Sequence, residues 1–175
     1  MTGQVIWITG LSGAGKSTLA GLLVKHLKVY KKGVLLLDGD LLRDVFNAST
    51  ANHSRKDRLE LAMQYARLCR VISDQGITVV IATISLFQEI HDWNRANLPG
   101  YYEVYLKVPL DELRRRDPKQ IYKRFDEGEL DNVAGLDLPI EEPENPDWIV
   151  EFNSESTAIS IADELLQRLK NEERV

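Results

Sequence analysis

Two kinds of hydrophobic pattern alternate along the chain. Short apolar runs of four to eight residues, rich in β-branched side chains, predict strands that are buried on both faces. Between them, apolar residues recur every three or four positions, which predicts amphipathic helices. The expected strands cover 5–9, 34–37, 77–84, 102–108 and 148–152, and the expected helices cover 19–27, 54–75, 87–93, 110–116 and 158–169.

Strands that alternate with helices imply right-handed crossovers and a parallel sheet with helices on both faces. At 175 residues the chain has the length of one domain. The sequence therefore predicts a single α/β domain over 1–175, a three-layer αβα sandwich around a roughly five-stranded parallel sheet. In such folds ligands bind outside the carboxyl ends of the strands.

The stretch 117–146 departs from this pattern, because it is polar, carries most of the prolines and shows no sustained period. Two interpretations remain open for it, a mobile lid over a binding site or an ordered functional insertion.

A glycine-rich motif links the first strand to the first helix. Gly10-Leu-Ser-Gly-Ala-Gly15-Lys16-Ser17 matches G-x-x-x-x-G-K-[ST], in the strand–turn–helix context that such a phosphate-binding loop (P-loop) requires. Backbone amides and the helix N-terminus would hold phosphates, Lys16 would reach the β- and γ-phosphates, and Ser17 would ligate Mg²⁺. The predicted ATP contacts here are Gly10, Leu11, Ser12, Gly13, Ala14, Gly15, Lys16, Ser17 and Thr18.

Asp38 and Asp40 lie two residues apart at the end of the second strand. If the chain is still extended there, both carboxylates face one side, near the phosphate loop. One could then hold Mg²⁺ through water while the other accepts the proton of an attacking hydroxyl, and we take Asp38 as the candidate metal ligand. The alternative is a plain strand-to-helix turn with an Asp N-cap.

Basic side chains are the candidates for binding anions. Arg43 and Arg58 suit a second anionic substrate, although each could also be a solvated surface arginine. The segment at the front of the lid is basic as well and could close over a triphosphate; a solvated basic helix face is the alternative. Its cations are Arg114, Arg115, Arg116, Lys119, Lys123 and Arg124.

Charge and composition exclude several functions. A formal net charge of −5 disfavours DNA or RNA as a partner. Cys69 is the only cysteine and falls on an apolar helix face, which predicts a buried, inert thiol and a reducing compartment. The histidines lack zinc-ligand spacing. With no basic leader and no apolar run near 18 residues, we expect a cytoplasmic protein that does not interact with membranes.

Several further motifs follow the P-loop in a fixed order, and together with it they resemble adenylylsulfate kinases from about 5 to 148. They are Asp38-Gly-Asp40-x-x-Arg43, Asp57-Arg58, Ile84-Ser85, Arg116-Asp-Pro-Lys-x-x-Tyr122-Lys123 and Pro143-Glu-Asn-Pro146. The resemblance implies a homodimer that uses MgATP to phosphorylate the ribose 3′-hydroxyl of adenylylsulfate, yielding the sulfate donor used in assimilation.

The resemblance also implies roles for individual residues. Asp40 would be the base. Arg43 and Arg58 would bind the anionic bridge of the substrate. Arg116 would lie against the ATP adenine, and Lys119 would contact phosphate from the lid. The remaining acceptor-site residues would be Asp38, Ile84 and Ser85; Ser85 matches a serine once proposed as a phosphorylated catalytic intermediate, which direct in-line transfer does not need.

Three departures from the family pattern concern the acceptor. Leu61 stands where the family usually has a substrate-binding Asn, Val133-Ala134-Gly135 replaces Phe-Thr-Gly, and Asn52-His53-Ser54 replaces Gly-Phe-Ser. Both phenylalanines that would sandwich the substrate adenine are therefore lost, and each stacking face contributes about 1–3 kcal/mol. The stretch 84–95 looks like the cytidine diphosphoramidate kinases of capsule synthesis, so cytidine diphosphoramidate is the alternative acceptor.

Two hypotheses from other functional classes are weaker. A GTP-binding switch requires an Asn-Lys-x-Asp guanine reader, which the sequence lacks. A nucleotide-binding module without catalysis is disfavoured because the residues for phosphate, metal and proton handling occur together: Lys16, Ser17, Asp38, Asp40 and Arg43.

Overall fold

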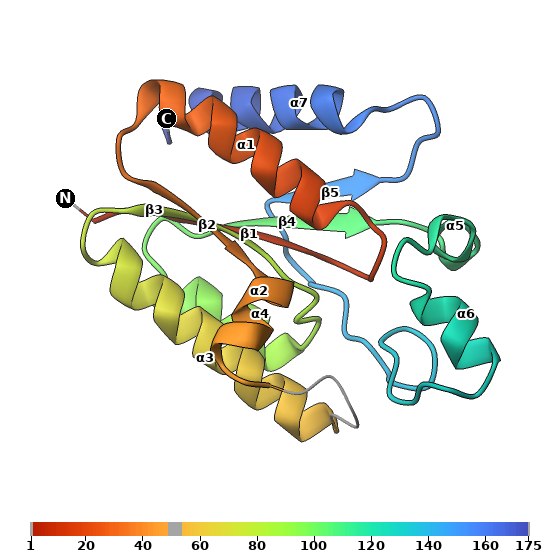
Figure 1. The fold of residues 1–175 in the computed structure, drawn as a ribbon. Helices are drawn as coiled ribbons and strands as arrows, with labels where there is room; N and C mark the ends of the chain where they lie inside the picture. The colour runs from red at the N-terminus through yellow and green to blue at the C-terminus, as the bar shows by residue number, and fades with distance from the viewer. Residues whose placement is uncertain (1, 49–53, 175) are drawn as a thin grey trace.

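The computed structural model describes residues 2–48 and 54–174 (Figure 1). The strands are β1 (Val5–Gly10), β2 (Val34–Asp38), β3 (Thr78–Ala82), β4 (Tyr102–Lys107) and β5 (Trp148–Glu151). The helices are α1 (Lys16–Tyr30), α2 (Gly39–Val45), α3 (Arg55–Ser73), α4 (Gln88–Asn97), α5 (Leu110–Arg116), α6 (Ile121–Asp126) and α7 (Ala158–Asn171).

The strands of the described chain form one five-stranded sheet in the order β2-β3-β1-β4-β5. Every neighbouring pair is parallel, and Ile8 at the centre of β1 aligns with Ala82 on one side and Val104 on the other. All residues of β1 are buried, as a central strand covered on both faces requires. The predicted parallel α/β architecture is confirmed.

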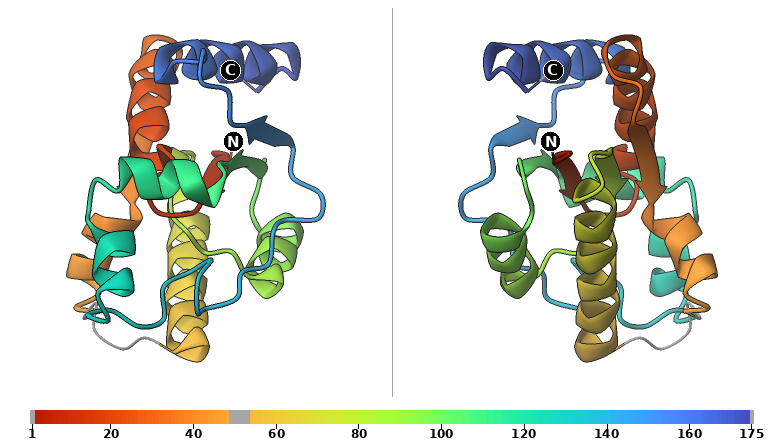
Figure 2. Two further views of the ribbon diagram at one scale, coloured as in Figure 1. Left: turned by 90° about the vertical axis from the view of Figure 1, so that its right-hand side faces the viewer. Right: turned by 90° about the vertical axis from the view of Figure 1, so that its left-hand side faces the viewer.

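Helices cover both faces of the sheet (Figure 2). The side chains of β1 alternate between two cores: Ile6 and Ile8 pack with α1 and α7, whereas Val5 and Trp7 pack with α3 and α4. Each core consists of aliphatic and aromatic side chains, so burial of apolar surface holds the three layers together.

Local signals in the sequence account for the ends of α3. The hydroxyl of Ser54 accepts a hydrogen bond from the amide of Asp57, whose carboxylate accepts one from the Ser54 amide, forming a capping box. Beyond the last turn, Gly76 has φ +84°, a conformation that glycine adopts without strain. Cys69 on this helix is fully buried, as expected, and burial raises the pKa of its thiol, which disfavours the reactive thiolate.

Residues 117–147 leave the sheet beyond β4 and return to it as β5. They contain one helix that the sequence pattern did not predict, α6, because six residues are too few to show a period. The Asp117 carboxylate starts this helix by accepting hydrogen bonds from the amides of Ile121, Tyr122 and Lys123. In Figure 1, α5 and α6 lie beyond the carboxyl ends of the strands, at the edge where the ligand site was expected.

No helix within residues 2–48 and 54–174 combines the length and the apolar character that crossing a bilayer requires.

Candidate active site

The phosphate cradle is the turn between β1 and α1. A side chain at Gly10 is sterically excluded, because a Cβ there would lie 2.7 Å from the carbonyl oxygen of Leu106. Gly15 has φ +100°, and a Cβ at this position would have no neighbouring atom within 4 Å, so the backbone turns beside open space. Gly15 is also the N-cap of α1 and supplies no side-chain acceptor. The first amides of α1 therefore form a site suited to an anion.

Lys16 is the buried cation of this cradle. Its ammonium donates a hydrogen bond to the carbonyl oxygen of Leu11 at 2.8 Å. Burial, followed by repulsion from Lys119 and Arg43, lowers the pKa of Lys16 to about 7, although Asp38 acts in the opposite direction. A phosphate bound beside this ammonium would supply negative charge and stabilise the protonated form of Lys16.

Asp38 and Asp40 stand at the end of β2, but the chain is not extended through both of them. The strand ends at Asp38 and α2 begins at Gly39, so the assumption that both carboxylates project from one extended segment was wrong. Asp38 is the N-cap of α2, and its carboxylate accepts a hydrogen bond of 2.8 Å from the amide of Asp40. The turn-and-cap alternative therefore describes the backbone here.

The Asp40 carboxylate, on the first turn of α2, is shared between two cations. One oxygen pairs with Arg43 and the other with Lys119, which reaches it from the loop before α6. Burial and repulsion from Arg43 lower the pKa of Lys119. The predicted base and two predicted anion-binding residues thus meet at one point.

A cavity of about 680 Å³ opens beside this ion-pair cluster. It is lined by eight residues named as candidates from the sequence, which come from separate segments of the chain: Ser12, Asp40, Arg43, Arg58, Ile84, Ser85, Lys119 and Arg124. Lys16 borders the same region, since its ammonium interacts electrostatically with Lys119, Arg43 and Asp38. The phosphate cradle and the predicted acceptor site are therefore adjacent, as transfer between two bound substrates requires.

Arg58 joins α3 to the lid segment across the cavity. Its guanidinium donates a hydrogen bond of 2.7 Å to the carbonyl oxygen of Asn132. Burial and repulsion from Arg43 lower its pKa, with Asp137 acting in the opposite direction. Two arginines that repel one another across a cavity favour an anion between them.

Ser85 lines the cavity in a strained conformation. Its φ is +32°, in the left-handed region that non-glycine residues seldom occupy, and its hydroxyl lies 2.8 Å from that of Thr83. The preceding carbonyl, of Ile84, accepts a hydrogen bond from the Thr9 hydroxyl. Ser85 is 6% exposed, so its hydroxyl is part of a nearly buried pair at the cavity wall.

Arg116, at the end of α5, lies outside this cavity but against the cradle. Its guanidinium lies over the ring of Phe152 at 5.2 Å and within 3.4 Å of the Gly13 carbonyl oxygen. Tyr122 of α6 fastens the same loop, because its hydroxyl donates to the Ser12 carbonyl oxygen at 2.9 Å.

Several cavity residues were not among the sequence candidates. Ala62 and Tyr65 follow Arg58 at helical spacing, so the position of Arg58 on α3 was a signal that could have found them; Leu61, beside them, was already named as a departure from the family pattern. Val133 and Ala134 were named as departures from the family pattern, but no comparable signal marked the rest of the wall from the lid segment and the loop after β3: Thr83, Leu86, Phe87, Leu138, Pro139 and Ile140. The Asn52-His53 departure lies outside the described residues.

The residues present fit Mg²⁺ of the kind that is held chiefly by nucleotide phosphates. Such an ion takes one or two protein oxygens, with phosphates and waters completing its shell. Ser17 lies at the first turn of α1, and the Asp38 carboxylate lies close enough to the cradle to raise the pKa of Lys16. Among the described residues no cluster of three or more acidic, His or Cys ligands exists, so an all-protein metal cage is not indicated there.

Comparison with known proteins now identifies the family. The sequence profile of the adenylylsulphate kinase family matches residues 2–151, which is most of the chain. The chain belongs to the adenylylsulfate kinase family. An adenylyl-sulfate kinase of Clostridium acetobutylicum is 40% identical over 173 residues, covering 96% of this chain and 84% of that protein. A cytidine diphosphoramidate kinase of Campylobacter jejuni is 39% identical over 140 residues, covering 80% and 81%.

Solved structures agree with this membership. The Mycobacterium tuberculosis APS kinase, in complex with AMPPNP and APS, superposes with a TM-score of 0.86 at 31% identity, covering 97% of this chain and 98% of that one. As a member of the adenylylsulfate kinase family, the protein is a phosphotransferase whose acceptor group is a hydroxyl.

Proposed function

We propose that this family member transfers the γ-phosphoryl group of MgATP to the ribose 3′-hydroxyl of an acidic nucleotide, with adenylylsulfate as the first candidate. The observation that carries the proposal is the shared cavity, where Asp40, Arg43 and Arg58 face the region bordered by Lys16. One wall thus offers a proton acceptor and two anion-binding groups, and the adjoining loop offers a phosphate cradle.

In the proposed reaction the acceptor oxygen attacks the γ-phosphorus, and the bond from that phosphorus to the β–γ bridging oxygen breaks. The hydroxyl proton passes to the Asp40 carboxylate. Arg43 and Arg58 bind the anionic bridge of the acceptor, and Lys16 binds the β- and γ-phosphates. Bound Mg²⁺, held through Ser17 and Asp38, would neutralise charge on the phosphate oxygens.

Lys119 changes partners in this proposal. In the structure its ammonium pairs with the Asp40 carboxylate. With a triphosphate present, Lys119 would contact phosphate and leave the Asp40 carboxylate available to the acceptor hydroxyl. Arg116 would lie against the ATP adenine, in keeping with its position beside the cradle and over the Phe152 ring.

A second acceptor, cytidine diphosphoramidate, is favoured by the composition of the cavity wall. Leu61, Val133 and Ala134 line it where the family pattern has the substrate-binding Asn and Phe-Thr. An aliphatic wall offers a purine less stacking energy than two aromatic faces do, by about 1–3 kcal/mol per face. A pyrimidine is smaller, so it loses less stacking energy than a purine does when aliphatic side chains replace the aromatic ones.

An acceptor screen distinguishes these candidates. Purified protein with MgATP is incubated separately with adenylylsulfate and with cytidine diphosphoramidate, and ADP release is followed. We expect ADP only when an acceptor is present, and the ratio of kcat/KM values assigns the acceptor. ADP release that is the same with and without either nucleotide would refute the proposal.

Assembly, compartment and lid movement are further proposals. We place the enzyme in the cytoplasm as a homodimer, from its single cysteine and its family resemblance, and light scattering of the purified protein measures the subunit number. We also propose that 1–175 forms one domain and that part of 117–146 acts as a lid. Hydrogen exchange with and without nucleotide would reveal a lid as a segment protected by ATP.

A further inference from the structure

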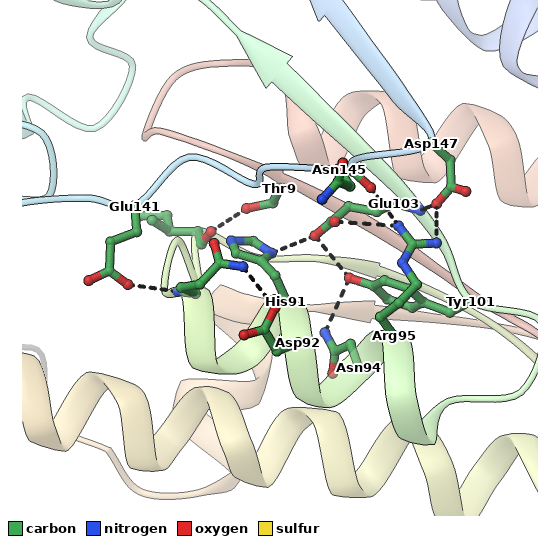
Figure 3. A network of polar contacts seen from close by, with 12 residues as sticks. Thr9, His91, Asp92, Asn94, Arg95, Tyr101, Glu103, Glu141, Asn145 and Asp147 are labelled. Carbon is green, nitrogen blue, oxygen red and sulfur yellow. Dashed lines mark hydrogen bonds and ion pairs between the residues drawn. The ribbon is translucent and has the colours of Figure 1, made fainter.

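The last part of the lid segment, residues 141–147, runs beside α4 on its way to β5 and is held at two points (Figure 3). We call these residues the return stem. At its beginning, Glu141 meets the N-terminus of α4, and at its end, Asp147 and Asn145 meet Arg95 on the same helix. The lid segment is thus attached to α4 at the end that leads into β5.

The first fastening is a network centred on Glu141. Its carboxylate accepts a hydrogen bond of 2.7 Å from the Gln88 amide, at an α4 N-terminus that has no side-chain cap of its own. Its backbone amide donates to the Leu86 carbonyl oxygen at 3.1 Å. Arg55 at the start of α3 pairs with Glu141 at 3.0 Å and with Glu89 at 2.9 Å.

The second fastening rests on a buried carboxylate. Arg95 pairs with Asp147 at 2.8 Å and donates to the Asn145 carbonyl oxygen at 3.0 Å. Arg95 also faces Glu103, which is 2% exposed and accepts hydrogen bonds from Tyr101 at 2.9 Å and from His91 at 2.5 Å. Arg95 therefore links the end of the return stem to a buried carboxylate.

The contacts of Arg55 differ from those of an ordinary surface arginine in a single ion pair. A solvated pair contributes little, but Arg55 bridges two carboxylates and lies over the ring of Phe87 at 5.3 Å. The residues next to this network, Leu86, Phe87 and Ile140, are cavity wall. A shift of Glu141 would therefore move the surface against which the acceptor packs.

We propose that Arg55 and Glu141 are positioning residues for the acceptor: they fix the return stem to α3 and α4, so that the wall of the acceptor cavity is preformed. Movement of the lid is then confined to its front part, 117–140. The effect on acceptor KM rests on the proposed function, because its measurement requires an acceptor that is turned over. The attachment of the return stem to α3 and α4 can be tested on the free protein, without an acceptor.

Hydrogen exchange tests the structural side on the free protein. In Arg55→Gln we expect peptides that contain Gln88 and Glu141 to exchange about three- to tenfold faster, because their amides depend on this network. Lys56→Gln is the matched control, since within the described part of the chain the exposed Lys56 pairs at 3.8 Å with Glu60, one turn further along α3, and touches no part of this network. Unchanged exchange in Arg55→Gln, or equal acceleration in Lys56→Gln, would overturn the inference.

Kinetics tests the positioning role. Arg55→Gln should raise the acceptor KM about three- to tenfold and leave kcat and the ATP KM within about twofold, because the network touches the wall and not the reacting atoms. In the double variant Arg55→Gln/Glu141→Gln, the loss of acceptor affinity, expressed as a free energy from the acceptor KM, should be smaller than the sum of the losses in the two single variants. A loss of kcat at unchanged acceptor KM, or additive effects, would contradict the role. If no acceptor is turned over, the proposed function fails while the exchange result still decides this inference.

Discussion

The phosphate cradle and the acceptor cavity adjoin at the same edge of the sheet but are built differently. The cradle is one continuous turn, Gly10 to Ser17, whose ligands are largely backbone amides at the start of α1. The cavity draws its walls from α2, α3, the loop after β3 and the lid segment. A local motif can therefore keep ATP handling constant while changes in several distant segments alter the acceptor, and substitutions in each region should have separable effects.

The largest effect should come from the cradle. Replacing Lys16 with Met removes the buried ammonium that would bind the β- and γ-phosphates, so we expect kcat to fall about 10³-fold or more. Calorimetry should show weakened ATP binding as well. Lys25→Met, at an exposed position of α1, is the control and should behave as the wild type. Wild-type turnover in Lys16→Met would remove the cradle from the mechanism.

On the acceptor side, Arg58→Gln should raise the acceptor KM about 10- to 100-fold and change the ATP KM little. The reason is that a charge-assisted contact to an anion contributes about 1.5–3 kcal/mol. Arg67→Gln, on the exposed side of the same helix, serves as the control. An equal rise in the ATP KM would show that the two regions are not separable.

The pH dependence of ATP binding should report the state of Lys16. Its pKa is lowered to about 7 in the free protein, so the ammonium is largely neutral above that pH and charged below it. Bound phosphate raises this pKa, and ATP binding at pH 8 should therefore take up close to one proton. Calorimetry in buffers of different ionisation enthalpy measures that uptake. Lys16→Met should abolish it; uptake that persists in this variant would assign the proton to another group.

The smallest expected effect concerns the base of the acceptor. Val133→Phe places an aromatic ring in the cavity wall, where a purine could stack for about 1 kcal/mol or more. We expect the ratio of kcat/KM for adenylylsulfate over cytidine diphosphoramidate to rise about five- to tenfold, with the ATP KM as the internal control. An unchanged ratio would mean that Val133 does not face the base.

Sequence reasoning succeeded where the determinants are local. Strands, capping residues such as Ser54 and the phosphate loop each depend on a few neighbouring residues, and the five-stranded parallel sheet followed from their order. It failed in the lid segment, where the six-residue α6 depends on the Asp117 cap and not on periodicity. The two-aspartate turn was misjudged because a helix that begins at Gly39 competes with continued strand. The family pattern identified Leu61, Val133 and Ala134 of the aliphatic wall, whereas Leu138, Pro139 and Ile140 gave no local signal, since they meet the cavity only in three dimensions.

The central claim is that Asp40 accepts the proton of the acceptor hydroxyl, and Asp40→Asn tests it most directly. The amide keeps the size of the side chain but cannot take up the proton, so kcat should fall about 10²- to 10⁴-fold. ATP affinity, measured by calorimetry, should stay within about twofold, and Asp44→Asn on the same short helix should retain full activity. Near-complete loss of turnover with intact ATP binding is the predicted result; wild-type turnover in Asp40→Asn would contradict the account.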